Sequence, residues 1–486
     1  MRPSLRLLDT ELVCRILTEA RDLLDTLGLE IHNPSVREML AAEGARIDPV
    51  TSRVCLGTPL VDRALASALR TFRLYDVLGR ETHHFGTGTV SFTPGSAAIN
   101  ILDGATGAIR PPHTADYVRY VKVVGGLRHL ASQSTAFIPA DVPSAISDSY
   151  RLFLSFLYGE KPVVTGAFTV EAFRVMRDLQ VIVRGGGETL RERPLAVFSC
   201  CPTAPLKWSD VTSQNVVDCA RSGIPVEFIS MPLAGFVAPV TLVGSLIQQT
   251  AETLSGLVIS QVASAGAPVL WGGSPAIFDI RYETTPMGAV ETMMIDCAFT
   301  EIGHSLGLPT QAYMGLSDAK ALDAQAGLES GLGVALAALS GVDNVSGPGM
   351  LDFEACHSLE KLVVDNEVCG MVQRLVRGIE PRDDFPARPL FEELLREKHL
   401  LIARHTRRHL REEIALPGPV IDRANLARWT EEGRSTLGDR ARREIARLVA
   451  AWQPSALGDD VKAELVRRME SEARRAGMDR LPERDA

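Results

Sequence analysis

Short apolar runs alternate with longer amphipathic stretches through the middle of the chain. Runs such as LAVFSCC and PVLWGG are apolar at most positions, which is typical of parallel strands covered by helices. The runs recur at intervals of about 30 to 42 residues, the length of one strand–helix unit. We place their starts near Ala97, Ala131, Lys161, Pro194, Pro225, Ala267, Pro309 and Asp343.

One unit is clearest between Pro309 and Asp352. Thr310–Met314 is predicted to be a strand, and a polar loop follows in which Ser317 or Asp323 caps the next helix. Leucine and alanine then recur at helical spacing until Gly341 ends the helix. Other expected helix starts are Thr114, Ser147, Ser209 and Thr285, and other expected stops are Gly125, Gly223, Gly266 and Gly307.

Eight such units predict a (β/α)8 TIM barrel. A doubly wound sheet usually has fewer strands, and no GxGxxG turn follows the first strand here. We assign residues 81–378 to a catalytic barrel and 1–80 to an N-terminal α/β cap. Residues 379–486 turn charged and helical and are expected to form a C-terminal helical extension that makes subunit contacts in a homo-oligomer.

Composition narrows the function classes. The chain is 45% hydrophobic and 23% charged with a net charge of −9, which argues against nucleic-acid or anionic-membrane binding. It lacks a run long enough to span a membrane and a signal-peptide core, so we expect a cytoplasmic protein. The eight cysteines are scattered without zinc spacing, so no metal is expected.

In a TIM barrel the chemistry lies at the carboxyl ends of the strands. These ends are rich in aromatic residues, which together suggest a cage for a cation although each alone is more often core. Acidic side chains near them could face such a cation. The predicted substrate-binding set is Phe92, Gln133, Phe168, Glu227, Trp271, Glu283 and Tyr313.

Asp318, Phe353 and His357 complete the candidate site as the residues expected nearest the chemistry. Asp323 and Glu329 are equally compatible with a place in the site and with the start of a helix, whereas Lys320 is better explained as a solvated loop residue. His357 is equally compatible with packing. The pattern therefore supports a barrel enzyme with a small aromatic pocket and does not name its reaction.

Several segments, in order, resemble the trimethylamine methyltransferase family. They are LLDTLGLEIHNPSVREMLAAEGARID, MPLAGFVAPVTLVGSL, GLPTQAYMGLSDAKALDAQAGLES, GPGML, EKLVVDNE and DRANLARWTEEG. The resemblance implies transfer of a methyl group from an amine to the cobalt of a corrinoid (cobalamin) on a partner protein. Trimethylamine enzymes of the family carry pyrrolysine near the position of Phe353. Because ordinary residues stand here, the resemblance implies a quaternary amine such as glycine betaine or a related betaine.

Two other functions remain open at this point. A barrel lyase or aldolase would need a perturbed lysine or a carboxylate–metal set. A non-catalytic partner of the corrinoid system would bind the methylated amine without turning it over.

Overall fold

The computed structural model describes residues 3–484, and within them eight parallel strands close into a barrel. Two sheets, β15-β13-β11-β10-β9 and β17-β18-β6, are joined at both seams. The Trp271 N–H donates to the Pro309 carbonyl (2.8 Å), and the Ala131 N–H donates to the Phe92 carbonyl (3.0 Å). The barrel strands are β6 (Ser91–Thr93), β9 (Gln133–Ser134), β10 (Val163–Thr165), β11 (Ala196–Cys200), β13 (Val226–Phe228), β15 (Val269–Leu270), β17 (Gln311–Tyr313) and β18 (Asn344–Ser346).

The TIM-barrel prediction is confirmed, with one shift. The first barrel strand lies at Ser91–Thr93, upstream of the expected start at Ala97. Residues Asn100–Leu102 instead form β7 in a separate sheet. There β7 pairs with β8 (Ile109–Arg110) and β20 (Cys356–His357), and β20 pairs in turn with β19 (Met350–Leu351). Both runs are apolar, so periodicity alone did not separate barrel strand from loop strand.

Each barrel strand is followed by a covering helix. Ser209 and Asp323 cap their helices as expected, accepting from the N–H groups of Thr212 and Ala326. The expected starts at Ser147 and Thr285 are wrong, because α5 begins at Ser144 and α10 begins at Val290. The helices are α4 (Thr114–Gly126), α5 (Ser144–Tyr158), α6 (Val170–Arg184) with α7 (Gly187–Glu192), α8 (Asp210–Ser222), α9 (Leu242–Ala263), α10 (Val290–Ser305), α11 (Ala324–Ser340) and α12 (Leu359–Val376).

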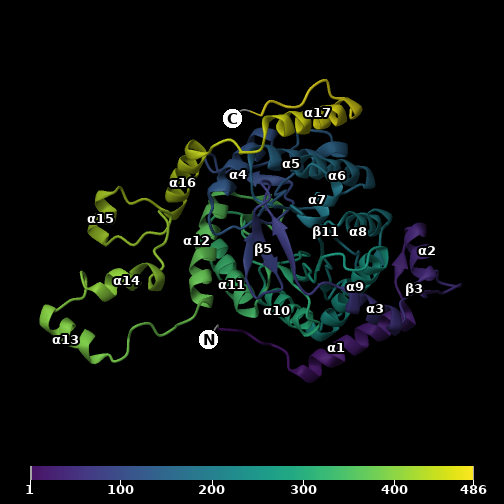
Figure 1. Cartoon of the computed structure of the whole chain (residues 1–486), viewed down its shortest axis with the longest axis horizontal. Coiled ribbons are helices and arrows are strands. Elements are labelled where there is room, and N and C mark those ends of the chain that lie inside the picture. The colour runs from purple at the N-terminus through teal and green to yellow at the C-terminus, as the bar shows by residue number, and fades with distance from the viewer. Residues whose placement is uncertain (1–2, 485–486) are drawn as a thin grey trace.

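A hairpin closes the amino-terminal end of the barrel (Figure 1). It pairs β4 (Phe72–Tyr75) with β5 (Glu81–Phe85). Its buried side chains Phe72, Leu74 and Phe85 form one cluster with Val164, Val197 and Leu270 of the barrel strands. The barrel floor is therefore sealed by apolar packing, and polar chemistry is left to the opposite end.

The remaining N-terminal elements pack on the outside. Helices α1 (Thr10–Asp22) and α3 (Thr58–Ser67) lie against α9. The strand β1 (Glu30–Ile31) pairs in parallel with β12 (Lys207–Trp208). Between them lie a π-helical turn (Leu23–Leu27), α2 (Pro34–Ala42), and the hairpin of β2 (Arg46–Ile47) and β3 (Val54–Cys55).

The C-terminal region divides into an arm and a return (Figure 1). Helices α13 (Arg388–Glu397), α14 (Arg404–Glu413) and α15 (Leu426–Glu431) stand away from the barrel, whereas α16 (Leu437–Ala451) packs on α4 and α12. The last helix, α17 (Asp459–Arg475), packs on α5 and α6. Among residues 3–484, every helix is too short or too polar to cross a membrane. The domain limits at residues 80 and 378 stay a prediction.

Leu74 tests the floor. It is 1% exposed between barrel and hairpin, so Leu74→Ala leaves a cavity where the structure has little room to collapse. We expect a loss of about 2–5 kcal/mol in the free energy of unfolding, measured by chemical denaturation. Val50→Ala, at a side chain 89% exposed, is the matched control and should change stability little. Equal effects of the two changes would show that the hairpin is not a seal.

Candidate functional site

Polar side chains line the inside of the barrel above the apolar floor. Successive side chains of a strand point to opposite faces, so Glu227 of β13 points inward while Phe228 contacts α9 at Gly256. The Glu227 carboxylate accepts from Ser199 Oγ at 2.7 Å and from Asn344 Nδ2 at 3.4 Å. Burial raises the pKa of Glu227 to about 7 against these two hydrogen bonds, which lower it.

A second carboxylate enters this space from the loop after β18. Asp352, Phe353 and Glu354 all have positive φ, at 51°, 54° and 68°, a conformation that non-glycine residues seldom adopt. The turn buries the Glu354 carboxylate, whose Oε1 has no hydrogen-bond partner among the described residues. Burial raises the pKa of Glu354 well above its ordinary value. Strained backbone is common at functional sites, and here the strained turn holds the side chain of Glu354 in a buried position.

Tyr313 is close enough to both acids to be affected by their charges. Its hydroxyl donates to the Ser96 carbonyl at 3.4 Å. Burial, and then the charges of Glu354 and Glu227, raise the pKa of Tyr313 well above 10. Burial, followed by the neighbouring Cys200 and then by Glu227 and Glu354, raises the pKa of the Cys201 thiol to about 12. Glu227, Tyr313, Glu354 and Cys201 therefore share one buried, negatively biased space, which we call the acidic pocket.

Further polar atoms in this part of the barrel are buried without a partner among the described residues. Buried polar groups are normally paired, so a group of unpaired ones indicates a place for a polar ligand or ordered water. Asp296 of α10 is part of the same electrostatic environment, because the charge of Glu354 adds to burial in raising its pKa. The unpaired atoms are Gln249 Oε1 and Nε2, Asp296 Oδ2, Gln311 Nε2, Ser346 Oγ and Glu354 Oε1.

Asp318 holds a neighbouring loop in place. Its two oxygens accept from the backbone N–H groups of Met287 (3.0 Å) and Gly288 (2.9 Å). Burial raises the pKa of Asp318 to about 6, although these hydrogen bonds oppose the shift. Asp318 thus ties the loop after β17 to the loop before α10. Its predicted catalytic role stays a prediction.

His357 is fully buried beside the aromatic rings of Tyr120 and Phe137, each 5.4 Å from its centroid. Neither imidazole nitrogen has a hydrogen-bond partner among the described residues. Burial and the charge of Lys361 lower the pKa of His357 to about 3, so the ring is neutral at neutral pH. It also lines a cavity of about 170 Å³ with Phe137, Arg110 and Glu360. Its part in turnover stays a prediction.

Three predicted substrate contacts lie on the outer face of the barrel instead of at its mouth. The Trp271 indole N–H donates to the backbone carbonyl of Phe299 in α10 at 3.1 Å. The indole also stacks on the Phe299 ring, with 4.8 Å between the ring centroids. Gln133 Nε2 donates to the carbonyls of Ser155 and Lys161, outside the barrel. Phe92 alternates with Thr93, which bonds to Asn344, and so points outward. Side chains alternate between the two faces of a strand, so residue type alone does not indicate which face each one takes.

Three others lie on the rim. Phe168 is 62% exposed and lies under the Arg151 guanidinium. Glu283 is exposed in the loop after β15. Lys320 Nζ lies over the Phe353 ring, 3.8 Å from its centroid. The same nitrogen lies 3.3 Å from Asp352 Oδ1, with which it forms an ion pair. The inward side chains that sequence reasoning missed are Glu354 and Cys201. The available signal for Glu354 was its place in the sequence Asp352-Phe353-Glu354, which directly follows GPGML.

A closed TIM barrel with a buried acidic pocket at the carboxyl ends of its strands defines an enzyme-like site suited to a small cation. The chain belongs to the trimethylamine methyltransferase family, whose model matches residues 1–477. The family resemblance seen in the sequence is therefore confirmed. The chain is a family member in which ordinary residues follow the GPGML motif.

Two relatives from Desulfitobacterium hafniense have different printed activities at the same identity. The trimethylamine methyltransferase MttB is 28% identical over 448 residues, covering 92% of this chain and 90% of its own. The glycine betaine methyltransferase is 28% identical over 467 residues, covering 95% and 96%. Identity alone therefore does not choose between their substrates.

A solved structure has a similar fold. The Methanosarcina barkeri monomethylamine methyltransferase (MtmB) superposes with a TM-score of 0.52 at 10% identity, covering 98% of this chain and 89% of its own. This likeness supports the barrel architecture and carries no argument about substrate.

Glu227 gives a pH test of the pocket. Its pKa is near 7 in the fold and near 4.5 in the unfolded chain, so the folded state binds the proton more tightly. Its contribution to stability is therefore present below pH 4.5 and lost as the pH rises to about 7. We expect Glu227→Gln to gain stability relative to the wild type between these pH values, measured by denaturation across the range. A constant difference would place Glu227 in a solvated setting.

Proposed function

We propose that the protein transfers a methyl group from a quaternary amine, such as glycine betaine or a related betaine, to the Co(I) of a corrinoid on a partner protein. The observation that carries the proposal is the acidic pocket, where Glu354 and Glu227 approach Tyr313 with a carboxylate oxygen left unpaired. Buried carboxylates without a counter-charge are costly, and a permanent cation would compensate them.

The chemistry of a quaternary ammonium suits these residues. Its leaving amine departs neutral and needs no proton, so the protein has to bind, orient and desolvate the cation. Glu227 and Glu354 supply the opposing charge, and the Tyr313 ring supplies a face for the methyl groups. The neutral state of His357 agrees with a reaction that requires no general acid from it.

The position next to Glu354 separates this chain from pyrrolysine enzymes. The residue expected by resemblance to be pyrrolysine falls near Phe353, and here the adjacent side chain places a carboxylate in the pocket. A carboxylate stabilises a fixed positive charge, whereas it does not activate a tertiary amine for methyl transfer. This favours a quaternary substrate over trimethylamine.

The mouth of the barrel has a surface suited to the proposed partner. Exposed apolar side chains gather on the loops that follow the barrel strands, and Phe236 stacks on Phe278 there at 4.9 Å. Exposed apolar patches of this kind often mark protein interaction sites. We call this set the apolar rim: Ile99, Phe168, Met231, Phe236, Val240, Ile280 and Tyr282.

The rim residues would hold the partner, and the acidic pocket would hold the substrate. When docked, a Co(I) corrinoid supplies the nucleophile that accepts the methyl group. The chain's own work is then to point one N-methyl bond at the mouth and to exclude water from it. Asp318 contributes by fixing the loop at residues 287–288 beside the rim.

A lyase or aldolase has less support. The lysine with a strongly lowered pKa, about 7 through burial, is Lys161. Lys161 lies just before strand β10, at the floor end of the barrel. Its Nζ donates to the carbonyls of Val124, Leu127 and Leu130 at 2.6–2.7 Å. It therefore caps α4 and lies away from the mouth, where a Schiff-base lysine would be needed.

Glu354 is the residue to change first. Glu354→Gln keeps the shape and removes the charge, so we expect glycine betaine or tetramethylammonium to bind at least about tenfold more weakly, measured by calorimetry. Glu38→Gln, at an exposed side chain of α2 outside the barrel, is the matched control and should leave affinity unchanged. The assignment of the pocket would be wrong if the control weakened binding as much as Glu354→Gln.

The reaction itself is tested with free cob(I)alamin and a panel of methylated amines, following the cobalt spectrum. We expect methylation of the cobalt with at least one quaternary amine and none with trimethylamine. Binding of the amine without any change in the spectrum, also with the corrinoid partner present, would indicate a non-catalytic binding protein. Equal rates with trimethylamine and a betaine would contradict the inference drawn from Phe353 and Glu354.

A further inference from the structure

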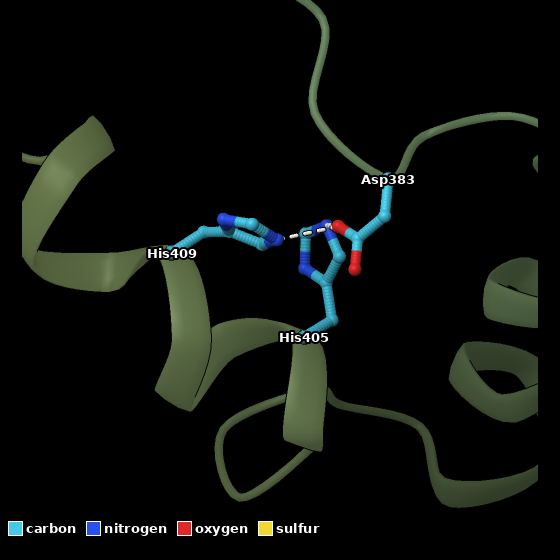
Figure 2. A group of neighbouring side chains, drawn as sticks. All are labelled: Asp383, His405 and His409. Atoms are coloured by element: carbon cyan, nitrogen blue, oxygen red, sulfur yellow. Dashed lines mark hydrogen bonds and ion pairs between the residues drawn. The ribbon is translucent and has the colours of Figure 1, made fainter.

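Three side chains with metal-binding atoms meet in the C-terminal arm (Figure 2). His405 and His409 project from one side of α14, and Asp383 approaches from the extended segment before α13. Asp383 Oδ1 lies 2.5 Å from His409 Nε2 and 3.7 Å from His405 Nε2. One ligand atom from each of the three residues lies within 4.8 Å of the others.

We propose that Asp383, His405 and His409 bind a divalent transition-metal ion of the zinc class, with water completing the coordination. This site is separate from the barrel and independent of the proposed function. The sequence predicted no metal, because its cysteines are scattered and no close Cys/His spacing is present. The fold brings Asp383 to the histidine pair across the whole of α13.

The residue types and their spacing support the ion. Histidines four residues apart lie on one helix face, the arrangement that binds zinc in helical His-x-x-x-His motifs. Zinc bonds of about 2.0–2.2 Å to nitrogen and oxygen put tetrahedral ligands about 3.3 Å apart. The observed spacings, 2.5 and 3.7 Å, bracket that value, so modest rotation of the side chains would reach it.

The surrounding charges leave one carboxylate oxygen facing the imidazoles. Arg408 NH1 lies 3.3 Å from Asp383 Oδ2, which leaves Oδ1 to the two histidines. An arginine on the second oxygen orients the ligand in the way outer partners of metal sites do. Asp384 Oδ1, 3.9 Å from His405 Nε2, adds a second negative charge that offsets the arginines of α14.

Unpaired nitrogens separate a metal site from a simple ion pair. A His409–Asp383 pair accounts for two of the three residues. It leaves His405 Nε2 buried with no hydrogen bond among the described residues, and likewise His409 Nδ1. An ion at the centre would satisfy His405 Nε2 directly and would replace the short Asp383–His409 contact by two coordination bonds.

The arm has a structural need for such a link. None of the residues Arg388–Glu397 of α13 is buried, and α14 buries only His409. Small units with little core are commonly stabilised by metals or disulfides. A metal bound by Asp383 and α14 would fasten the segment at residues 379–387 to that helix and fix the course of the arm.

The test uses the full-length protein stripped of metal with a chelator, and Zn²⁺ alone as the probe. We expect calorimetry to show one Zn²⁺ per chain. His405→Ala and Asp383→Asn should each lower the affinity by about 100-fold or more, because loss of even an outer partner costs 10–100-fold. Bound Co²⁺ should give the intense visible absorption of low-coordinate geometry, and Zn²⁺ should slow proteolysis at residues 379–387.

His399→Ala is the matched control, since His399 is an exposed histidine of the same arm. It should leave Zn²⁺ binding unchanged. The proposal is overturned if the wild type does not bind Zn²⁺, or if the two site variants and the control bind it equally. It is also overturned if His409→Ala destabilises the arm while Zn²⁺ has no effect on the wild type, because the cluster is then an ion pair. Using two site variants besides His409→Ala keeps the test valid if one fails to fold.

Discussion

The cost of burying carboxylates inside a barrel governs how this structure is built. Glu227 and Glu354 lie in surroundings that favour their protonated forms, and Glu354 has an oxygen without a partner. A charge so placed must be neutralised by a proton or by a ligand cation. The apolar floor below and the strained turn at Asp352–Glu354 hold these acids in place.

The same acids also limit the proposed reaction. Methyl transfer turns a cationic substrate into a neutral amine, so fixed negative charge stabilises the bound substrate more than the transition state. The raised pKa values of Glu227 and Glu354 reduce this preference for the bound substrate, because the two carboxylates carry full charge mainly while a cation is beside them. Binding of a quaternary amine should therefore release protons, and the pocket's own charge state follows its occupancy.

The fold was largely predictable and the site only partly so. Repeated apolar runs and stop glycines such as Gly223 and Gly341 identified the barrel, because strand burial and helix termination are local properties. The inner face was harder. Trp271 and Gln133 were expected in the pocket on residue type, but side-chain alternation turns both outward. Glu354 points inward through three positive φ values, which no propensity indicates, and Asp383 meets His405 only through the path of the arm.

The hairpin at the barrel floor has a kinetic consequence. Because Phe72, Leu74 and Phe85 fill that end, a ligand of the acidic pocket would have to enter from the mouth, over which the proposed partner would sit. The amine must then enter before the partner arrives, and the demethylated product must wait until it leaves. Such an enzyme follows a compulsory order, and a large excess of unmethylated partner would slow turnover by occluding the empty pocket.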